Sequence, residues 1–81
     1  MTEQEVLKTL QECVKEVIPE FQVSDISMDS DIKLDLKLDS FQMIGIASQI
    51  EESFGIEIMN EKLKEVESVG DLVHLIQELQ S

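Results

Sequence analysis

Apolar residues recur at helical spacing in three long segments of the chain. In the first segment they recur every three or four positions from Val6 to the residue before Pro19, with charged residues between them. Thr2-Glu3-Gln4-Glu5 in front of them has the form of a capping box, in which two side chains satisfy free N–H groups at a helix start. We therefore predict a first amphipathic helix that ends at Pro19.

A second helix is predicted from about Ser40 to Phe54, and Gly55 is well placed as its C-terminal stop. Its apolar stripe is expected to contain Met43, Ile44, Ala47, Ile50 and Phe54. Further on, Asn60 can cap a short helical turn through Leu63. Ser68-Val69-Gly70-Asp71 offers another capping box before a last apolar segment that continues to Leu79. These signals predict a short third helix and a longer fourth one.

The connection between Pro19 and Asp39 is long, and it carries many apolar residues. A loop of this length is usually functional or packed against the core. Its expected anchors are Phe21, Val23, Ile26, Met28, Ile32, Leu34, Leu36 and Leu38. The segment from Ile32 to Leu38 alternates as a strand does, but one strand without a partner leaves its backbone groups unsatisfied. We therefore expect an extended loop pinned by alternate leucines.

Together these elements predict an all-α fold, a small bundle of three main helices plus one short helix, with a long loop between the first two. At 81 residues the chain is expected to form a single domain, residues 1–81. A domain of this size buries only about 60–65% of the surface that its unfolded chain exposes. A deep catalytic cleft is therefore not expected.

The charge balance points to basic partners. Six lysines and no arginine against eighteen acids give a net charge of -12, which opposes binding to nucleic acid and to anionic membranes. No apolar stretch approaches the roughly 20 residues that cross a bilayer, and the N-terminus lacks a secretory pattern. A single cysteine agrees with a reducing compartment. We expect a cytoplasmic monomer.

The tripeptide Asp39-Ser40-Phe41 carries the most informative chemistry in the chain. It places a primary alcohol at a helix start, where the first N–H groups and the positive end of the helix dipole favour a phosphate esterified to it. The alternative is structural, because Asp and Ser are among the commonest N-cap residues. The dipeptide alone leaves both interpretations open.

Leu38-Asp39-Ser40-Phe41 at the start of the second helix, and Phe54-Gly55-Ile56-Glu57-Ile58 at its end, resemble the acyl carrier protein family. The resemblance implies that Ser40 bears 4'-phosphopantetheine, transferred from coenzyme A, and that Asp39 is the motif acid before it. The thiol of that arm holds acyl groups as thioesters. Phe41 replaces the family's usual leucine, and in this respect the motif is similar to that of the D-alanyl carrier proteins, which load an amino acid.

The resemblance further implies a carrier that catalyses nothing itself and serves fatty acid, polyketide or related biosynthesis. Its expected partners are a phosphopantetheinyl transferase and acyl-loading and condensing enzymes with basic docking patches. The segment from Leu38 to Glu61 contains five acids and no base, which suits such partners. The expected docking residues are Phe41, Met43, Ile44, Glu51, Glu52, Glu57, Met59 and Glu61. Gly45 and Ala47 leave space near Ser40 that an attached chain is expected to use.

Two other classes of function compete with the carrier. In the first, the chain is a non-covalent acidic helical interaction module and Ser40 is only a helix N-cap. In the second, Cys13 and His74 form the nucleophile and base of a thiol hydrolase. Asp29 and Asp31 have the spacing of a calcium loop, but Leu34 replaces its turn glycine, so no metal site is expected.

Overall fold

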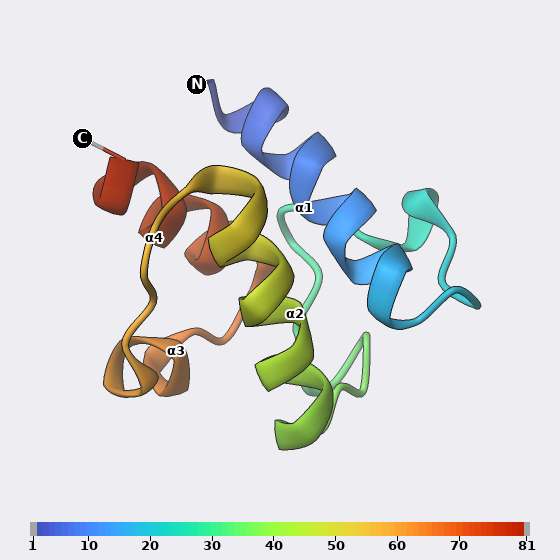
Figure 1. Cartoon of the computed structure of the whole chain (residues 1–81). Helices are drawn as coiled ribbons and strands as arrows, with labels where there is room; N and C mark the ends of the chain where they lie inside the picture. The colour runs from blue at the N-terminus through green and yellow to red at the C-terminus, as the bar shows by residue number, and fades with distance from the viewer. Residues whose placement is uncertain (1, 81) are drawn as a thin grey trace.

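The computed structural model describes residues 2–80, and its regular elements there are helical (Figure 1). The elements in chain order are α1 (Glu3–Val17), the 3-10 turn η1 (Val23–Asp25), α2 (Ser40–Phe54), α3 (Asn60–Glu65) and α4 (Val69–Gln80). This order confirms the predicted all-α fold of three main helices and one short one, with a long connection between α1 and α2. None of these helices is long and apolar enough to cross a membrane.

The three main helices pack around one core, and α3 lies to the side of α2 (Figure 1). α1 contacts both α2 and α4, and Glu3 at the start of α1 pairs with His74 of α4. The largest fully buried side chains come from all three helices and from the connection: Val6, Leu10, Ile26, Ile46, Ile50, Val73 and Ile76. Burying an aliphatic side chain of this size contributes about 1.5–3 kcal/mol, so this core is the main source of stability.

The helix boundaries follow the predicted capping signals. At α1, Thr2 Oγ1 accepts a hydrogen bond from the backbone N–H of Glu5, and the Glu5 side chain accepts one from Thr2 N. The backbone N–H groups of Ser68 and Glu67 donate to Asp71 before α4 and lower the pKa of its carboxyl group. Gly55 closes α2 in the left-handed conformation at φ 67°. All three termination or capping predictions are confirmed.

The predicted apolar stripe of α2 is partly wrong. Ile44 is 59% exposed, whereas Ile46, which the stripe omitted, is 1% exposed. Met43, Ile46 and Ile50 follow the helical repeat on the face that packs against the core. The sequence alone did not decide between two neighbouring apolar faces, because isoleucine stands on both.

The cap of α3 was also predicted wrongly. Asn60 is the first helical residue, and Met59 before it occupies the cap position without a side-chain hydrogen bond. The Met59 carbonyl accepts hydrogen bonds from the backbone N–H groups of Lys62 and Leu63, so the start of the short helix is held by backbone hydrogen bonds alone. α3 therefore lacks the side-chain bonds that fix the starts of the main helices.

The segment from Ile32 to Leu38 is a turn and not the extended loop that its alternation predicts. Asp31 Oδ1 accepts hydrogen bonds from the N–H groups of Lys33 and Leu34 at 2.9 and 2.8 Å, which curls the chain. Leu34 is consequently 75% exposed, and Val23 is exposed as well, so neither serves as an anchor. The anchors that the structure does bury in the connection are Ile26, Ile32, Leu36 and Leu38.

The connection is also clamped to the segment before α4. Residues 28–32 exchange backbone hydrogen bonds with residues 67–70, and Asp31 and Ser68 form an isolated antiparallel bridge. A Cβ added to Gly70 would lie 2.9 Å from the Met28 carbonyl oxygen, so the close approach requires glycine there. These bonds hold the connection against the core without a sheet.

Ile46→Ala and Ile44→Ala form a matched pair that tests which face of α2 is buried. We expect Ile46→Ala to lower the free energy of unfolding by about 2–5 kcal/mol, because it removes buried methyl groups and leaves a cavity. Ile44→Ala should change it by less than about 0.5 kcal/mol. Urea unfolding followed by circular dichroism measures both free energies of unfolding. Equal losses of stability in the two variants would contradict the burial of Ile46 and the exposure of Ile44.

Candidate functional site

A capping box formed by Asp39 and Gln42 sets the start of α2. Asp39 Oδ1 accepts from the backbone N–H of Gln42 at 2.7 Å, and Gln42 Oε1 accepts from the backbone N–H of Asp39 at 3.1 Å. The N-cap is therefore Asp39, and Ser40 is the first residue of the helix. The alternative in which Ser40 serves as the N-cap is wrong, because the preceding carboxylate already fills that role.

The Ser40 side chain is left free by this arrangement. Ser40 is exposed, and its hydroxyl makes no hydrogen bond to any residue of the described range 2–80. Leu38, two positions earlier, is buried and ties the incoming chain to the core. Because a free oxygen stands at the first turn, nearby N–H groups and the helix dipole favour an anionic group on it. The position can hold a phosphate ester without rearrangement of the fold.

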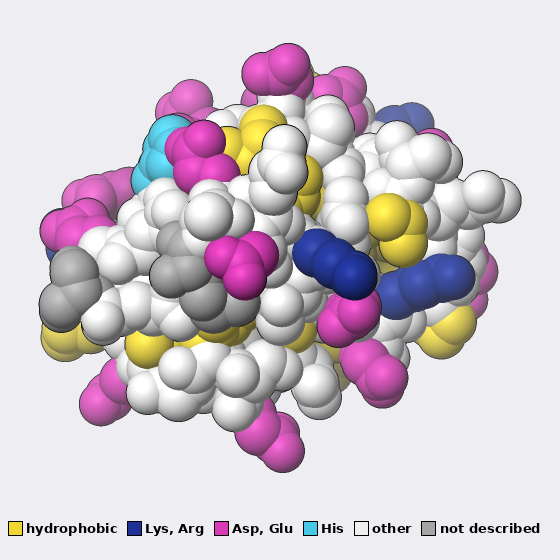
Figure 2. Space-filling model, turned by 90° about the horizontal axis from the view of Figure 1, so that it is seen from above, with side chains coloured by type: hydrophobic (Ala, Val, Ile, Leu, Met, Phe, Trp, Pro, Cys, Tyr) yellow, Lys and Arg dark blue, Asp and Glu magenta, His cyan; other side chains and the backbone are white. Residues whose placement is uncertain are grey.

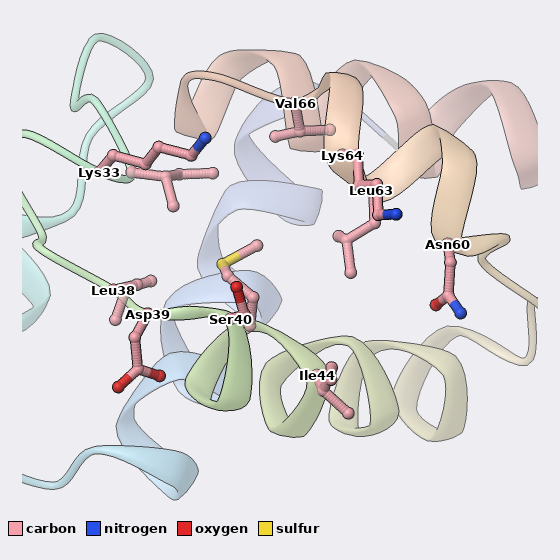
Figure 3. Close-up of a pocket in the computed structure, with 11 residues that line it drawn as sticks. Lys33, Leu38, Asp39, Ser40, Ile44, Asn60, Leu63, Lys64 and Val66 are labelled. Carbon is pink, nitrogen blue, oxygen red and sulfur yellow. The ribbon is translucent and has the colours of Figure 1, made fainter.

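A groove of about 510 Å³ opens beside Ser40, between the start of α2, α3 and the turn that precedes α2 (Figure 3). Its apolar lining consists of Ile32, Leu38, Met43, Ile44, Leu63 and Val66. Its polar lining consists of Lys33, Asp39, Ser40, Asn60 and Lys64. The volume lies in the range of small-molecule sites, so the groove can receive part of a flexible organic group.

Gly45 and Ala47 do not line this groove, contrary to the expectation that they provide its space. A Cβ at Gly45 would meet Val17 Cγ1 at 3.4 Å, so Gly45 faces the end of α1. It allows the two helices to approach closely. The open space beside Ser40 is the groove toward α3.

The predicted docking residues fall into different environments. Phe41, Ile44 and Met59 are 84%, 59% and 61% exposed, so these apolar side chains are accessible at the surface. Met43 is half-buried and packs against the core. Of the four glutamates among the predicted docking residues, Glu52, Glu57 and Glu61 are exposed.

Glu51 differs from the other acids because it has a structural partner. Its Oε2 accepts a hydrogen bond from the backbone N–H of Ile58 at 2.8 Å, and the side chain is half-buried. Glu51 thus fastens the chain that leaves α2 to the helix itself. A substitution there would disturb the fold as well as any docking surface.

Acidic side chains are not confined to α2. Figure 2 shows them around the whole outline of the molecule, with lysines in small groups between them. Negative charge is therefore spread over this face of the molecule, in agreement with the net charge of -12.

The structure does not bring Cys13 and His74 together. Cys13 is buried, its thiol donates to Ser53 Oγ at 3.6 Å, and burial raises its pKa, so the reactive thiolate is disfavoured. His74 pairs with Glu3, which lies about 15 Å before Cys13 along α1 at about 1.5 Å per residue. The pair cannot act as a nucleophile and base.

Asp31 and Asp35 in the connection stabilise its turn by hydrogen bonds to backbone N–H groups. Asp31 accepts two backbone N–H groups, and Asp35 Oδ2 accepts from Asp31 N at 2.8 Å. Among residues 2–80 there is no group of three or more side chains placed to hold a metal ion. The spacing of Asp31 and Asp35 is therefore explained by a hydrogen-bonded turn.

Sequence reasoning missed several residues of the site. Gln42 was detectable, because Asp39 and Gln42 have the spacing of a capping box. The lining residues Lys33, Asn60, Leu63, Lys64 and Val66 had no sequence signal. They join Ser40 only through the packing of α3 and of the preceding turn beside α2.

Comparison with known proteins gives consistent matches. A family model described as the phosphopantetheine attachment site matches residues 8–76. The chain is 34% identical over 80 residues to the acyl carrier protein of Rhodococcus erythropolis, covering 99% of this chain and 87% of that protein. It is 30% identical over 77 residues to the acyl carrier protein of Coprothermobacter proteolyticus, covering 95% and 93%. It is also 34% identical over 79 residues to the meromycolate extension acyl carrier protein of Mycolicibacterium smegmatis, covering 98% and 79%.

Proposed function

The chain belongs to the acyl carrier protein family, whose members carry acyl groups and do not catalyse reactions, and we propose that Ser40 is its attachment residue. The family's cofactor is 4'-phosphopantetheine, which supplies a thiol that holds acyl groups as thioesters. The observation that carries the proposal is the exposed, unbonded hydroxyl of Ser40 directly after the Asp39 cap. It lies within the matched range of residues 8–76.

Asp39 acts in this proposal by presenting Ser40. Its hydrogen bond to Gln42 holds the first turn of α2, so the backbone of Ser40 is presented to a partner enzyme at a fixed helix start. During transfer, the Ser40 oxygen forms a bond to the phosphorus of coenzyme A next to pantetheine. The pyrophosphate bond breaks, the nucleotide part leaves, and the transferase removes the hydroxyl proton.

The proposed cargo is an acyl chain of fatty acid biosynthesis or a related pathway. The relatives from Mycolicibacterium smegmatis and Mycobacterium tuberculosis are named for meromycolate extension, a process of lipid synthesis. The groove beside Ser40 is lined mainly by aliphatic side chains, which favours an apolar load over an amino acid with a charged amine. Phe41, which the D-alanyl carrier proteins share, points to solvent and takes no part in the groove.

The proposed partners are a phosphopantetheinyl transferase and loading and condensing enzymes, which the protein meets as a monomer. Phe41, Ile44 and Met59 supply apolar contacts beside Ser40. Glu52, Glu57 and Glu61 surround them with negative charge that steers basic patches into register. Glu51 is half-buried and one of its carboxylate oxygens is bonded to the backbone N–H of Ile58, so the test below uses a different acid.

The attachment site is tested by intact mass after incubation with coenzyme A and a phosphopantetheinyl transferase. We expect one phosphopantetheine adduct on the unaltered protein and none on Ser40→Ala. Ser48→Ala, an exposed serine of the same helix, is the matched control and should be modified fully. An adduct that persists in Ser40→Ala, or no adduct with several transferases, contradicts the proposal.

The docking surface is tested with Glu52→Lys, which reverses one exposed charge of α2 without touching the bond of Glu51. We expect transfer onto Ser40 to slow by about 2- to 10-fold at low ionic strength, and the difference to shrink in about 1 M salt. Glu12→Lys on α1 is the control and should have a smaller effect. Equal rates for both variants would remove Glu52 from the docking surface.

The groove is the proposed resting place of a short acyl load. Its lining methyl groups on Leu63 and Val66 are aliphatic and lie within reach of an arm on Ser40 (Figure 3). We expect their NMR resonances to shift when the arm is loaded with a butyryl group. Resonances that stay where they are in the unloaded holo protein would show that the chain remains in solvent.

A further inference from the structure

Two lysines flank the groove beside Ser40. Lys33 extends over it from the turn before α2, and Lys64 lies on α3 across from it (Figure 3). Neither ammonium group has a hydrogen-bond or ion-pair partner among residues 2–80. Both cations are therefore available to a group that enters the groove.

Their placement contrasts with the charge of the rest of the molecule. The chain has only six lysines against eighteen acids, yet two of the six line this one groove. The only acid among the lining residues is Asp39, whose carboxylate accepts the N–H of Gln42 at the helix start. The groove is thus a local site for an anion on a protein whose overall field repels anions.

The anion that the attachment of an arm brings to this place is the phosphodiester on Ser40. It keeps one negative charge, and it is bonded to an oxygen that itself lines the groove. A lysine has a flexible four-carbon stem and three donors, so it can reach a phosphate oxygen without a fixed geometry. Contacts between an ammonium and a phosphate are charge-assisted and stronger than neutral hydrogen bonds.

We propose that Lys33 and Lys64 are positioning residues that hold the phosphodiester of the arm and turn the pantetheine part toward the apolar floor of the groove. The proposal rests on Ser40 as the attachment site. Lys33 and Lys64 offset the repulsion that Asp39 and the net charge exert on the phosphate. The floor next to them is formed by Leu38, Leu63 and Val66. In the free protein an arm held in this way lies in the groove, and it leaves the groove when a partner enzyme binds the phosphate instead.

The test uses phosphorus NMR of the full-length holo protein, with the methyl resonances of Leu63 and Val66 as a second readout. The variants are Lys33→Gln, Lys64→Gln and the double variant. The matched control is Lys62→Gln, an exposed lysine of the same short helix that does not line the groove. Circular dichroism checks that each variant keeps its helices, and intact mass checks that each carries the arm.

We expect the phosphorus resonance to move in each single variant, to move furthest in the double variant, and to stay in place in Lys62→Gln. About 1 M salt should shift the unaltered protein toward the double variant, because exposed charges are screened beyond about 3 Å at that concentration. The methyl resonances should move in the same variants. A phosphorus resonance that is equal in all variants overturns the proposal, even when the mass shows a complete adduct on Ser40.

A negatively charged cargo is the other source of an anion in the groove, and two loaded forms separate it from the phosphodiester. With a butyryl load, lysine dependence of the phosphorus resonance supports the phosphodiester as the ligand. If dependence on Lys33 and Lys64 appears only with a succinyl load, in the methyl resonances alone, the lysines bind the cargo and the proposal is wrong. Absence of any adduct on Ser40 is a failure of the attachment site itself, which the mass detects separately.

Discussion

The reciprocal hydrogen bonds between Asp39 and Gln42 are the interaction on which the rest of the site depends. They fix where α2 begins, and they assign the capping role to Asp39. Ser40 is then the first residue inside the helix, with its oxygen bonded to nothing in residues 2–80. If Ser40 were the cap, its oxygen would accept a hydrogen bond from a backbone N–H of the first turn. One carboxylate thus separates a structural serine from one that is chemically available.

The surroundings of this helix start combine a rigid side with an open side. Leu38 and Ile46 are buried on the core side, so the main chain on both sides of Ser40 is held by packing. On the other side, α3 is short, starts without a side-chain cap and leaves a groove against α2. The proposed attachment residue thus stands on a helix start held by packing, with an open groove beside it. The charges also differ between the two regions. Acids are spread over the face in Figure 2, whereas Lys33 and Lys64 line the groove together with one acid, Asp39.

Most of the fold was predictable from the sequence because its signals are local. Capping boxes, Gly55 and the helical repeat of apolar residues define the elements, and the motif around Ser40 identified the family. The errors arose where local patterns are ambiguous. Isoleucines on two adjacent faces hid the buried side of α2, and alternating leucines concealed a turn that Asp31 closes with side-chain bonds. The groove had no local signal, because Lys33 and Lys64 are brought together only by tertiary packing.

We propose that the free oxygen at the start of α2 is the one that carries the arm. The most direct measurement is peptide mapping by mass spectrometry of the protein isolated from its own cells. The account predicts a phosphopantetheine ester on the peptide that contains Asp39-Ser40-Phe41, with fragment ions that place it on Ser40. A native protein without this group, or with it on a different residue, would contradict the account.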